Sequence, residues 1–206
     1  MPLYQLNGRN LLFIHVPKTG GKSVEAYLKS LSGGQALFHP RKQDIFPCSP
    51  QHMHAEMLEL LFGESYVQYS FMVVRNPYRR FVSEYHWRVT RKGGEQDFES
   101  WSHQVLDELE HDLFILDNHL RPQIEFRMRN TVVHRLEDGL ENAVHAAVQA
   151  VGLDLPVPVL DHTHRTDKAE VSGSRGLAER LKQLYAADFE AFGYDPEDLA
   201  KAFHLA

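Results

Sequence analysis

The chain has 206 residues, of which 43% are hydrophobic and 24% charged, a composition typical of one globular domain with a substantial buried core. Its formal net charge of -6 argues against a general nucleic-acid binder, because such proteins carry a basic surface that displaces counterions. No apolar run approaches the roughly 20 residues that cross a bilayer, and the first ten residues lack the features of a signal peptide. The single cysteine, Cys48, excludes an internal disulfide and fits a reducing compartment. From these two features we expect a soluble, cytoplasmic protein without a membrane span.

The chain begins with a pattern typical of a strand, a loop and a helix. The apolar run Leu11–Ile14 leads into His15-Val16-Pro17, and two glycines follow shortly after. Apolar residues then recur at i, i+3, i+4 and i+7, which indicates a helix. They are Val24, Tyr27, Leu28 and Leu31. Ser32-Gly33-Gly34 predicts the end of this helix, and the polar, proline-containing segment up to Gln51 predicts a loop.

A second strand, loop and helix follow further along the chain. We expect a short helix over residues 55–62 and then a strand over Tyr69–Val74, which is rich in β-branched and aromatic residues. Asn76 can cap a helix, and Pro77 suits a first helical position. One apolar stripe continues that helix. It consists of Tyr78, Phe81, Val82, Tyr85 and Val89.

The remaining pattern predicts helices over residues 98–110, 140–151 and 177–192, a strand over 131–134, and an irregular stretch over 153–166. Strands that alternate with helices indicate an α/β protein. We therefore predict a single domain over residues 1–206, with a three-layer, P-loop-like fold and a central parallel sheet flanked by helices. Ligands bind such sheets beyond the carboxyl ends of the strands, which is where both predicted loops lie.

The first loop, Val16–Ser23, has the parts of an oxyanion site. Paired glycines let the backbone approach a ligand, and N–H groups at a helix start can point at an anion. Two lysines and two hydroxyl groups add charge and hydrogen-bond donors. The residues concerned are Lys18, Thr19, Gly20, Gly21, Lys22 and Ser23. An ordinary strand-to-helix turn with solvated lysines is the simpler alternative, although such a turn would not need the lysines.

The end of this loop, Gly-Gly-Lys-Ser, is also similar to the end of a Walker A motif, and Leu113–Asp117 could serve as a Walker B strand. The Walker pattern, however, requires a glycine five residues before Gly21, where this chain has Val16. A kinase that uses ATP and magnesium is therefore the weaker alternative.

The second loop adds a local concentration of positive charge. Arg75 ends the predicted strand, and Arg79 and Ser83 lie one turn apart on the helix that follows, so their polar groups can converge on a phosphate. The basic residues of this stretch are Arg75, Arg79, Arg80, Arg88, Arg91 and Lys92. An arginine at a strand end is as often an ion-pair partner as a ligand. Together, the two loops predict that the partner is a small anion.

With both loops, the sequence resembles the carbohydrate-type sulfotransferase family related to heparan sulfate 2-O-sulfotransferase. The match rests on FIHVPKTGGKS and VVRNPYRRFVSEY and extends to Leu120–Gln123, Arg135–Glu137 and Tyr185–Tyr194. The resemblance implies that 3′-phosphoadenylyl sulfate (PAPS) is the sulfuryl donor. It further implies that the first loop, from Pro17 to Ser23, binds the 5′-phosphosulfate and that Arg75 and Ser83 bind the 3′-phosphate.

Sulfuryl transfer to a hydroxyl group needs charge stabilisation on the leaving phosphate and a base for the acceptor proton. Lys18 is the candidate for the first role. The segment Pro50-Gln51-His52-Met53-His54 is similar to the two-histidine segment of the 2-O-sulfotransferases, which makes His54 the candidate base and His52 a candidate substrate contact. Alternatively, His54 only caps or packs against the following helix. We expect no metal, because His52-x-His54 and His162-x-His164 lack a zinc pattern.

The resemblance leaves the acceptor open. His164–Lys168 matches the position of a loop that closes over the nucleotide in related enzymes, which implies that Arg165, Thr166 or Lys168 contacts the donor. A chain without an anchor and with one cysteine suggests a soluble bacterial-type member, and its acidic balance favours a small glycan, glycolipid or metabolite hydroxyl over a long polyanion. A non-catalytic nucleotide-binding module is a further alternative.

Overall fold

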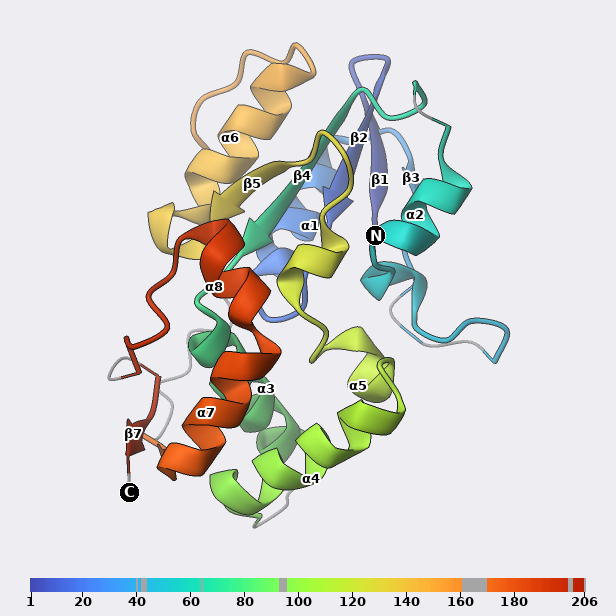
Figure 1. The fold of residues 1–206 in the computed structure, drawn as a ribbon. Helices are drawn as coiled ribbons and strands as arrows, with labels where there is room; N and C mark the ends of the chain where they lie inside the picture. Colours follow the sequence, from blue (N-terminus) through green and yellow to red (C-terminus); the bar gives the residue numbers. More distant parts are fainter. Residues whose placement is uncertain are drawn as a thin grey trace. The chain divides into compact units, whose positions relative to one another are not determined.

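The computed structural model describes residues 1–39, 41, 44–63, 65–92, 96–160, 170–199 and 202–205, with the side chains of residues 90–92 left aside. The chain divides into two compact units. The first comprises Met1–Val74 and Glu125–Arg165, and the second comprises Arg75–Ile124 and Thr166–Ala206. Figure 1 shows the elements of both. No helix in the described part of the chain is long and apolar enough to cross a membrane.

The first unit is built on a mixed sheet with strand order β3-β1-β2-β4-β5. Its strands are β1 (Leu3–Leu6), β2 (Arg9–Ile14), β3 (Gln35–Ala36), β4 (Tyr69–Val74) and β5 (Val132–Arg135). Strands β2, β4 and β5 are parallel, as expected, and the predicted strand Tyr69–Val74 is confirmed. Strand β1 is antiparallel to both β2 and β3, so the prediction of a fully parallel sheet was wrong at this edge.

The antiparallel edge has a local cause in the turn between β1 and β2. Asn7 and Gly8 both have positive φ, 49° and 71°, as two-residue hairpin turns require. This turn reverses the chain immediately, and Leu3 pairs with Leu12. Asn-Gly between apolar runs is a hairpin signal, but the sequence interpretation above began its first strand only at Leu11.

Helices flank the sheet of the first unit. They are α1 (Gly21–Leu31), α2 (Ala55–Leu61) and α6 (Leu140–Ala150), with the 3-10 helices η1 (Pro50–His52) and η3 (Leu136–Asp138). Alternate strand residues form a core with α1 and α6, in which the rings of Phe13 and Phe71 lie 5.0 Å apart. In the parallel register Ile14 lies opposite Met72 and Val74 opposite Arg135, so β2, β4 and β5 end at the same edge of the sheet.

The second unit is mainly helical. It contains α3 (Pro77–Lys92), α4 (Phe98–His111), α5 (Ile115–Asn118), α7 (Arg175–Leu184), α8 (Ala186–Phe192) and the short parallel strands β6 (Ser172–Gly173) and β7 (His204–Leu205). The 3-10 helix η2 (Gln123–Phe126) crosses the boundary between the units. The apolar stripe predicted for residues 78–89 packs in the core of this unit with Phe98, Trp101 and Leu181.

One sequence prediction in this unit was wrong, and one alternative weighed against the prediction finds no support. The single helix expected over residues 177–192 is interrupted at Tyr185, whose backbone leaves helical angles (φ -104°, ψ 18°). Its buried hydroxyl donates to the Leu120 carbonyl at 2.9 Å, a contact between distant segments that local periodicity does not encode. Residues 113–117, considered as a Walker B strand, form no strand, because α5 begins at Ile115.

Candidate functional site

The first predicted loop leads from the end of β2 directly into α1, as the sequence indicated. Lys18 and Gly20 both adopt the left-handed conformation, with φ of 70° and 85°, and Gly20 is the N-cap of the helix. This backbone turns the chain so that α1 starts at the edge where the parallel strands end. The Ser23 N–H donates to the Gly20 carbonyl at 3.1 Å. The start of a helix is nevertheless a place where backbone N–H groups can point at an anion.

Both loop glycines have a structural reason, which is backbone conformation at Gly20 and packing at Gly21. A Cβ atom added at Gly20, which also has positive φ, would lie 2.6 Å from Cδ1 of Leu140. A Cβ atom at Gly21 would lie 2.3 Å from Nε2 of His15. Because Leu140 Cδ1 is the end of a flexible side chain, the positive φ is the stronger reason for glycine at residue 20. At Gly21, a Cβ atom would require the buried imidazole or the start of α1 to shift.

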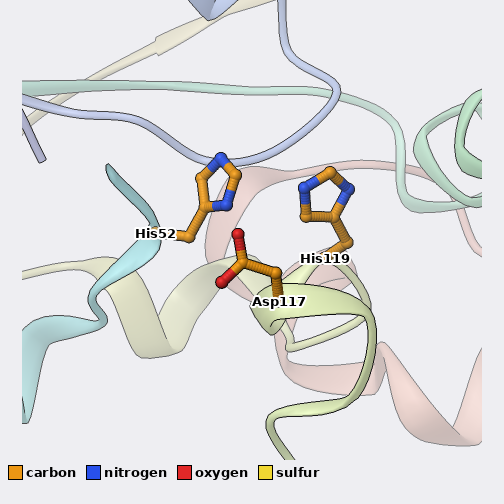
Figure 2. A group of neighbouring side chains, drawn as sticks. All are labelled: His52, Asp117 and His119. Atoms are coloured by element: carbon orange, nitrogen blue, oxygen red, sulfur yellow. The ribbon is translucent and has the colours of Figure 1, made fainter. Parts of the chain in front are cut away.

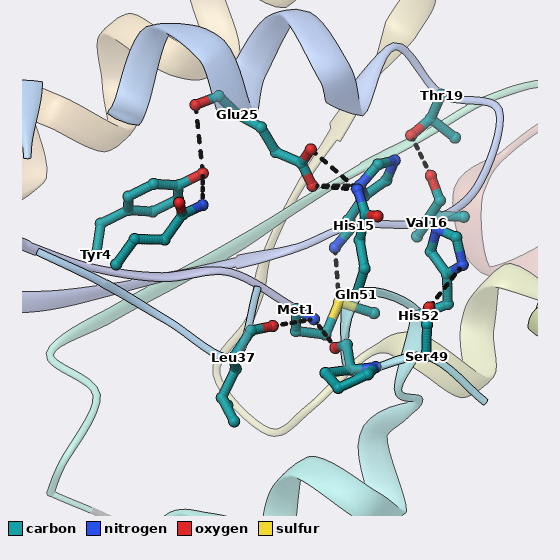
Figure 3. Close-up of polar contacts among 12 residues, drawn as sticks. Met1, Tyr4, His15, Val16, Thr19, Glu25, Leu37, Ser49, Gln51 and His52 are labelled. Atoms are coloured by element: carbon teal, nitrogen blue, oxygen red, sulfur yellow. Dashed lines mark hydrogen bonds and ion pairs between the residues drawn. The ribbon is translucent and has the colours of Figure 1, made fainter. Parts of the chain in front are cut away.

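The side chains of this loop differ in exposure. Lys22 is exposed, Lys18 and Ser23 are partly exposed, and Pro17 is buried. The Thr19 side chain is fully buried, and its hydroxyl donates to the Val16 carbonyl at 2.8 Å (Figure 3). Thr19 thus closes the loop on itself, and Lys18, Lys22 and Ser23 are the side chains with exposed surface for a ligand.

A buried polar cluster lies behind the loop (Figure 3). His15 Nδ1 lies 2.6 Å from Glu25 Oε1, and Gln51 Nε2 donates to both Glu25 oxygens at 2.8 and 2.9 Å. Each of the three residues is 5–6% exposed. Burial on its own would raise the pKa of Glu25, but the adjacent His15 and the hydrogen bonds from His15 and Gln51 outweigh it and lower that pKa. The carboxylate is therefore ionised at neutral pH.

The two histidines of the 50–54 segment are both buried. His52 Nδ1 lies 3.3 Å from the Ser49 hydroxyl, and its ring meets that of His15 edge-on at 5.4 Å between centroids. His54 is the N-cap residue of α2, yet its side chain makes no capping hydrogen bond, which does not favour the capping alternative. Its Nε2 lies 3.6 Å from the exposed carboxylate of Glu56.

The second predicted motif begins directly after β4. Asn76 Oδ1 accepts a hydrogen bond from the Arg79 N–H at 3.2 Å, and α3 starts at Pro77, so the predicted cap and first helical position are confirmed. Ser83 is 6% exposed, and Arg79, one turn before it, is partly exposed. The helix spacing places these two side chains on the same face of α3.

The backbone of Arg75 is held by Gln123, to which no sequence motif assigned a role. The Gln123 amide accepts from the Arg75 N–H at 2.9 Å and donates to the Arg75 carbonyl at 2.8 Å. Gln123 is itself anchored by Asp188, which accepts from the backbone N–H groups of Gln123 and Ile124 at 2.9 and 2.8 Å. Burial raises the pKa of Asp188, although Arg80 and these hydrogen bonds oppose the change. No local pattern links these residues, because they are 48 and 65 positions apart.

Two arginines of the basic stretch have structural partners. Arg80 is 1% exposed and donates to the carbonyls of His119 and Arg121 at 2.8 and 2.5 Å. Arg88 donates to Glu84 at 2.6 Å and to the Leu116 carbonyl at 3.0 Å. Arg80 and Arg88 therefore support the packing of the second unit.

A strained turn in the second unit presents a further histidine. Leu116, Asp117 and Asn118 have consecutive positive φ angles of 52°, 63° and 67°, a conformation that costs energy in residues other than glycine. Figure 2 shows Asp117 and His119 projecting from this turn. His119 Nδ1 lies 2.7 Å from Oε2 of Glu84, whose side chain is 1% exposed. A carboxylate at Nδ1 fixes the ring and its tautomer, an arrangement that suits a histidine for proton transfer at Nε2.

The segment expected to close over the nucleotide belongs to a part of the chain that the structure does not describe. His162, His164, Arg165, Thr166 and Lys168 lie outside the described residues. Of the remaining candidates, residues 17–23, His52 and His54 belong to the first unit, and Arg75 and Ser83 belong to the second.

Comparison with known proteins agrees with the sequence motifs. A search of curated proteins found no match, and neither did a search of solved structures. A family model described as "Sulfotransferase family" matches residues 6–195, which include both loops, the two-histidine segment and the turn at residues 116–119. The chain therefore belongs to the sulfotransferase family, in its carbohydrate-type branch related to heparan sulfate 2-O-sulfotransferase.

Proposed function

We propose that this protein is a PAPS-dependent sulfotransferase that moves a sulfuryl group to a hydroxyl group of a carbohydrate or glycoconjugate. Family membership supports sulfuryl transfer in general. The observation that carries the donor assignment is the loop after β2, where packed glycines and two lysines surround the start of α1. The family match spans both units, which supports treating the chain as one sulfotransferase domain with a P-loop-like, three-layer arrangement.

The donor is proposed to bind through two groups of residues. The first loop, from Pro17 to Ser23, would bind the 5′-phosphosulfate with its helix-start N–H groups and with Lys18, Lys22 and Ser23. Because the Thr19 hydroxyl is buried against Val16, Thr19 would contribute through its backbone. Arg75 and Ser83 would bind the 3′-phosphate, and the Gln123 amide would keep the Arg75 backbone in place.

The proposed reaction is an in-line transfer. The acceptor oxygen forms a bond to sulfur while the bond between sulfur and the phosphate oxygen breaks, and the acceptor proton passes to a histidine. Lys18 would stabilise the charge that develops on the leaving phosphate. Since the two lysines can supply this stabilisation, we propose that no metal is required.

His54 remains the proposed base, from its place in the two-histidine segment, and His52 the proposed acceptor contact. His119 is a second candidate for the base, because Glu84 orients its ring. Replacing each histidine separately by asparagine distinguishes them. The variant that lacks the true base should lose roughly 10²–10⁴-fold in kcat with little change in nucleotide affinity. Replacement of the other histidine should lower kcat much less.

The alternatives predict different ligands. An ATP-dependent kinase needs a Walker A glycine where this chain has Val16, and the supposed Walker B segment is not a strand. A non-catalytic module would bind the nucleotide without turnover.

The first experiment is isothermal titration with adenosine 3′,5′-bisphosphate and, separately, with ATP plus magnesium. Selective binding of the bisphosphate is the expected result, and binding of ATP alone would refute the sulfotransferase proposal. Arg75→Ala should weaken bisphosphate binding roughly 10–150-fold, by removing charge-assisted hydrogen bonds worth about 1.5–3 kcal/mol. Arg175→Ala, at an exposed arginine in α7, is the matched control. Unchanged binding by Arg75→Ala would mean that the 3′-phosphate site is misplaced.

A further inference from the structure

The buried carboxylate of Glu25 joins three segments of the first unit. Glu25 lies in α1, His15 directly follows β2, and Gln51 lies in η1. His15 Nδ1 and Gln51 Nε2 lie 3.1 Å apart, because both donate to Glu25 Oε1, at 2.6 and 2.8 Å. One carboxylate therefore binds side chains from two segments that are 36 positions apart.

At one end of this cluster, His15 packs directly against the first loop. Its ring stacks on Phe13, with centroids 5.6 Å apart, and its Nε2 edge lies where a Cβ of Gly21 would be. Because Glu25 fixes Nδ1, the ring cannot turn without breaking a buried hydrogen bond. The position of the loop backbone at Gly21 thus depends on the contact between His15 and Glu25.

At the other end, Gln51 belongs to the segment with the two histidines. It directly precedes His52, whose ring touches that of His15 edge-on, and lies three residues before His54. The two Gln51 hydrogen bonds to Glu25 hold this segment against α1. The cluster therefore connects the proposed donor loop to the proposed acceptor side within one unit.

Stability alone does not explain an ionised group at this place. Replacing buried ion pairs by well-packed apolar side chains is often neutral or stabilising, whereas the directed bonds of such pairs can fix one arrangement of the segments. Here the carboxylate accepts from a ring nitrogen and an amide at the same time, so both segments must keep one position to satisfy it.

We propose that His15, Glu25 and Gln51 are positioning residues that hold the 50–54 segment in register with the first loop, so that the acceptor hydroxyl is aligned with the sulfuryl group. The proposal rests on the proposed function. Misalignment of reacting groups by about 1 Å can cost roughly 10²-fold in rate, so these residues should affect kcat more than donor affinity.

The test exchanges the side chains of Glu25 and Gln51 in the full-length chain. Glu25→Gln keeps the shape but removes the charge, and it should lower kcat roughly 10–100-fold while weakening bisphosphate binding by a clearly smaller factor. The double variant Glu25→Gln/Gln51→Glu places a carboxylate at residue 51, near His15 Nδ1, and should recover most of the lost kcat. Glu179→Gln, at an exposed glutamate in α7, is the matched control.

Unchanged kcat in Glu25→Gln, or a folded double variant with no recovery, would overturn the proposal. Amide hydrogen exchange of the ligand-free proteins provides a readout that does not depend on activity. Glu25→Gln should speed exchange in residues 15–23 and 49–54 together, and the double variant should slow both again. Faster exchange in only one of these segments would also overturn the proposal. Failure of the wild type to bind the bisphosphate would instead refute the proposed function, and the exchange result would still decide whether the cluster couples the segments.

Discussion

The contact between Gly21 and His15 gives a sharp prediction for Gly21→Ala. The new Cβ would lie 2.3 Å from Nε2, 2.4 Å from Cδ2 and 2.7 Å from Cε1 of the imidazole. The ring cannot move aside freely, because Nδ1 is held by Glu25 at 2.6 Å and one face stacks on Phe13. The substitution must therefore displace either the start of α1 or the buried ring.

The size of the effect follows from opposing contributions. Alanine in a helix is about 1 kcal/mol more favourable than glycine, and Gly21 does not have the positive φ that would penalise it. Overpacking costs about 1–3 kcal/mol, and a weakened buried hydrogen bond costs about 1–3 kcal/mol more. We expect a net loss of roughly 1–5 kcal/mol in the free energy of unfolding, measured by chemical denaturation.

Gly33→Ala is the matched control, because nothing lies within 4 Å of a Cβ at Gly33. Its effect should stay within about 0.5 kcal/mol. The decisive comparison repeats Gly21→Ala in a His15→Ala background, where the obstructing ring is absent. There the added methyl should cost little, with a coupling energy of about 1–3 kcal/mol between the two sites. An equal loss in both backgrounds would refute the conclusion that the imidazole makes glycine necessary.

Three further predictions concern the supporting hydrogen bonds. Gln123→Ala should weaken bisphosphate binding roughly 5–150-fold in a titration, because the Arg75 backbone loses two hydrogen bonds of about 0.5–1.5 kcal/mol each; unchanged affinity would contradict this role. Thr19→Val should lower the free energy of unfolding by about 1–3 kcal/mol, because the Val16 carbonyl loses its hydrogen-bond donor. Thr19→Ser keeps the hydroxyl and should retain most of the wild-type stability. The pKa of Glu25 is lower in the folded protein than the ordinary value of 4.5. The ionised side chain therefore adds to the free energy of unfolding above about pH 4.5, and this contribution is lost as the pH falls through the folded-state pKa. In acid denaturation, Glu25→Gln should therefore lose less stability than the wild type between neutral pH and pH values below 4.5, and identical curves would contradict this.

Much of the local structure could be predicted from the sequence. The strand Tyr69–Val74, the helix after Gly20 and the cap at Asn76 follow from short-range patterns, because apolar periodicity and capping residues act over a few positions. The Asn7-Gly8 turn belongs to the same class. Its signal is present in the sequence, and recognising it would have predicted the antiparallel edge of the sheet.

In the candidate site, too, some residues could be predicted from short motifs and others could not. Short motifs indicated the two loops and the two-histidine segment, since the candidate anion-binding residues of each loop lie close together in the chain. The supporting contacts could not be predicted, because Glu25 with Gln51, Arg75 with Gln123, and Glu84 with His119 pair residues 26, 48 and 35 positions apart. The sequence by itself determined which groups are candidates to bind an anion. Only the tertiary structure decided which buried partners hold them, because packing of distant segments selects the one arrangement in which each buried carboxylate and amide is hydrogen-bonded.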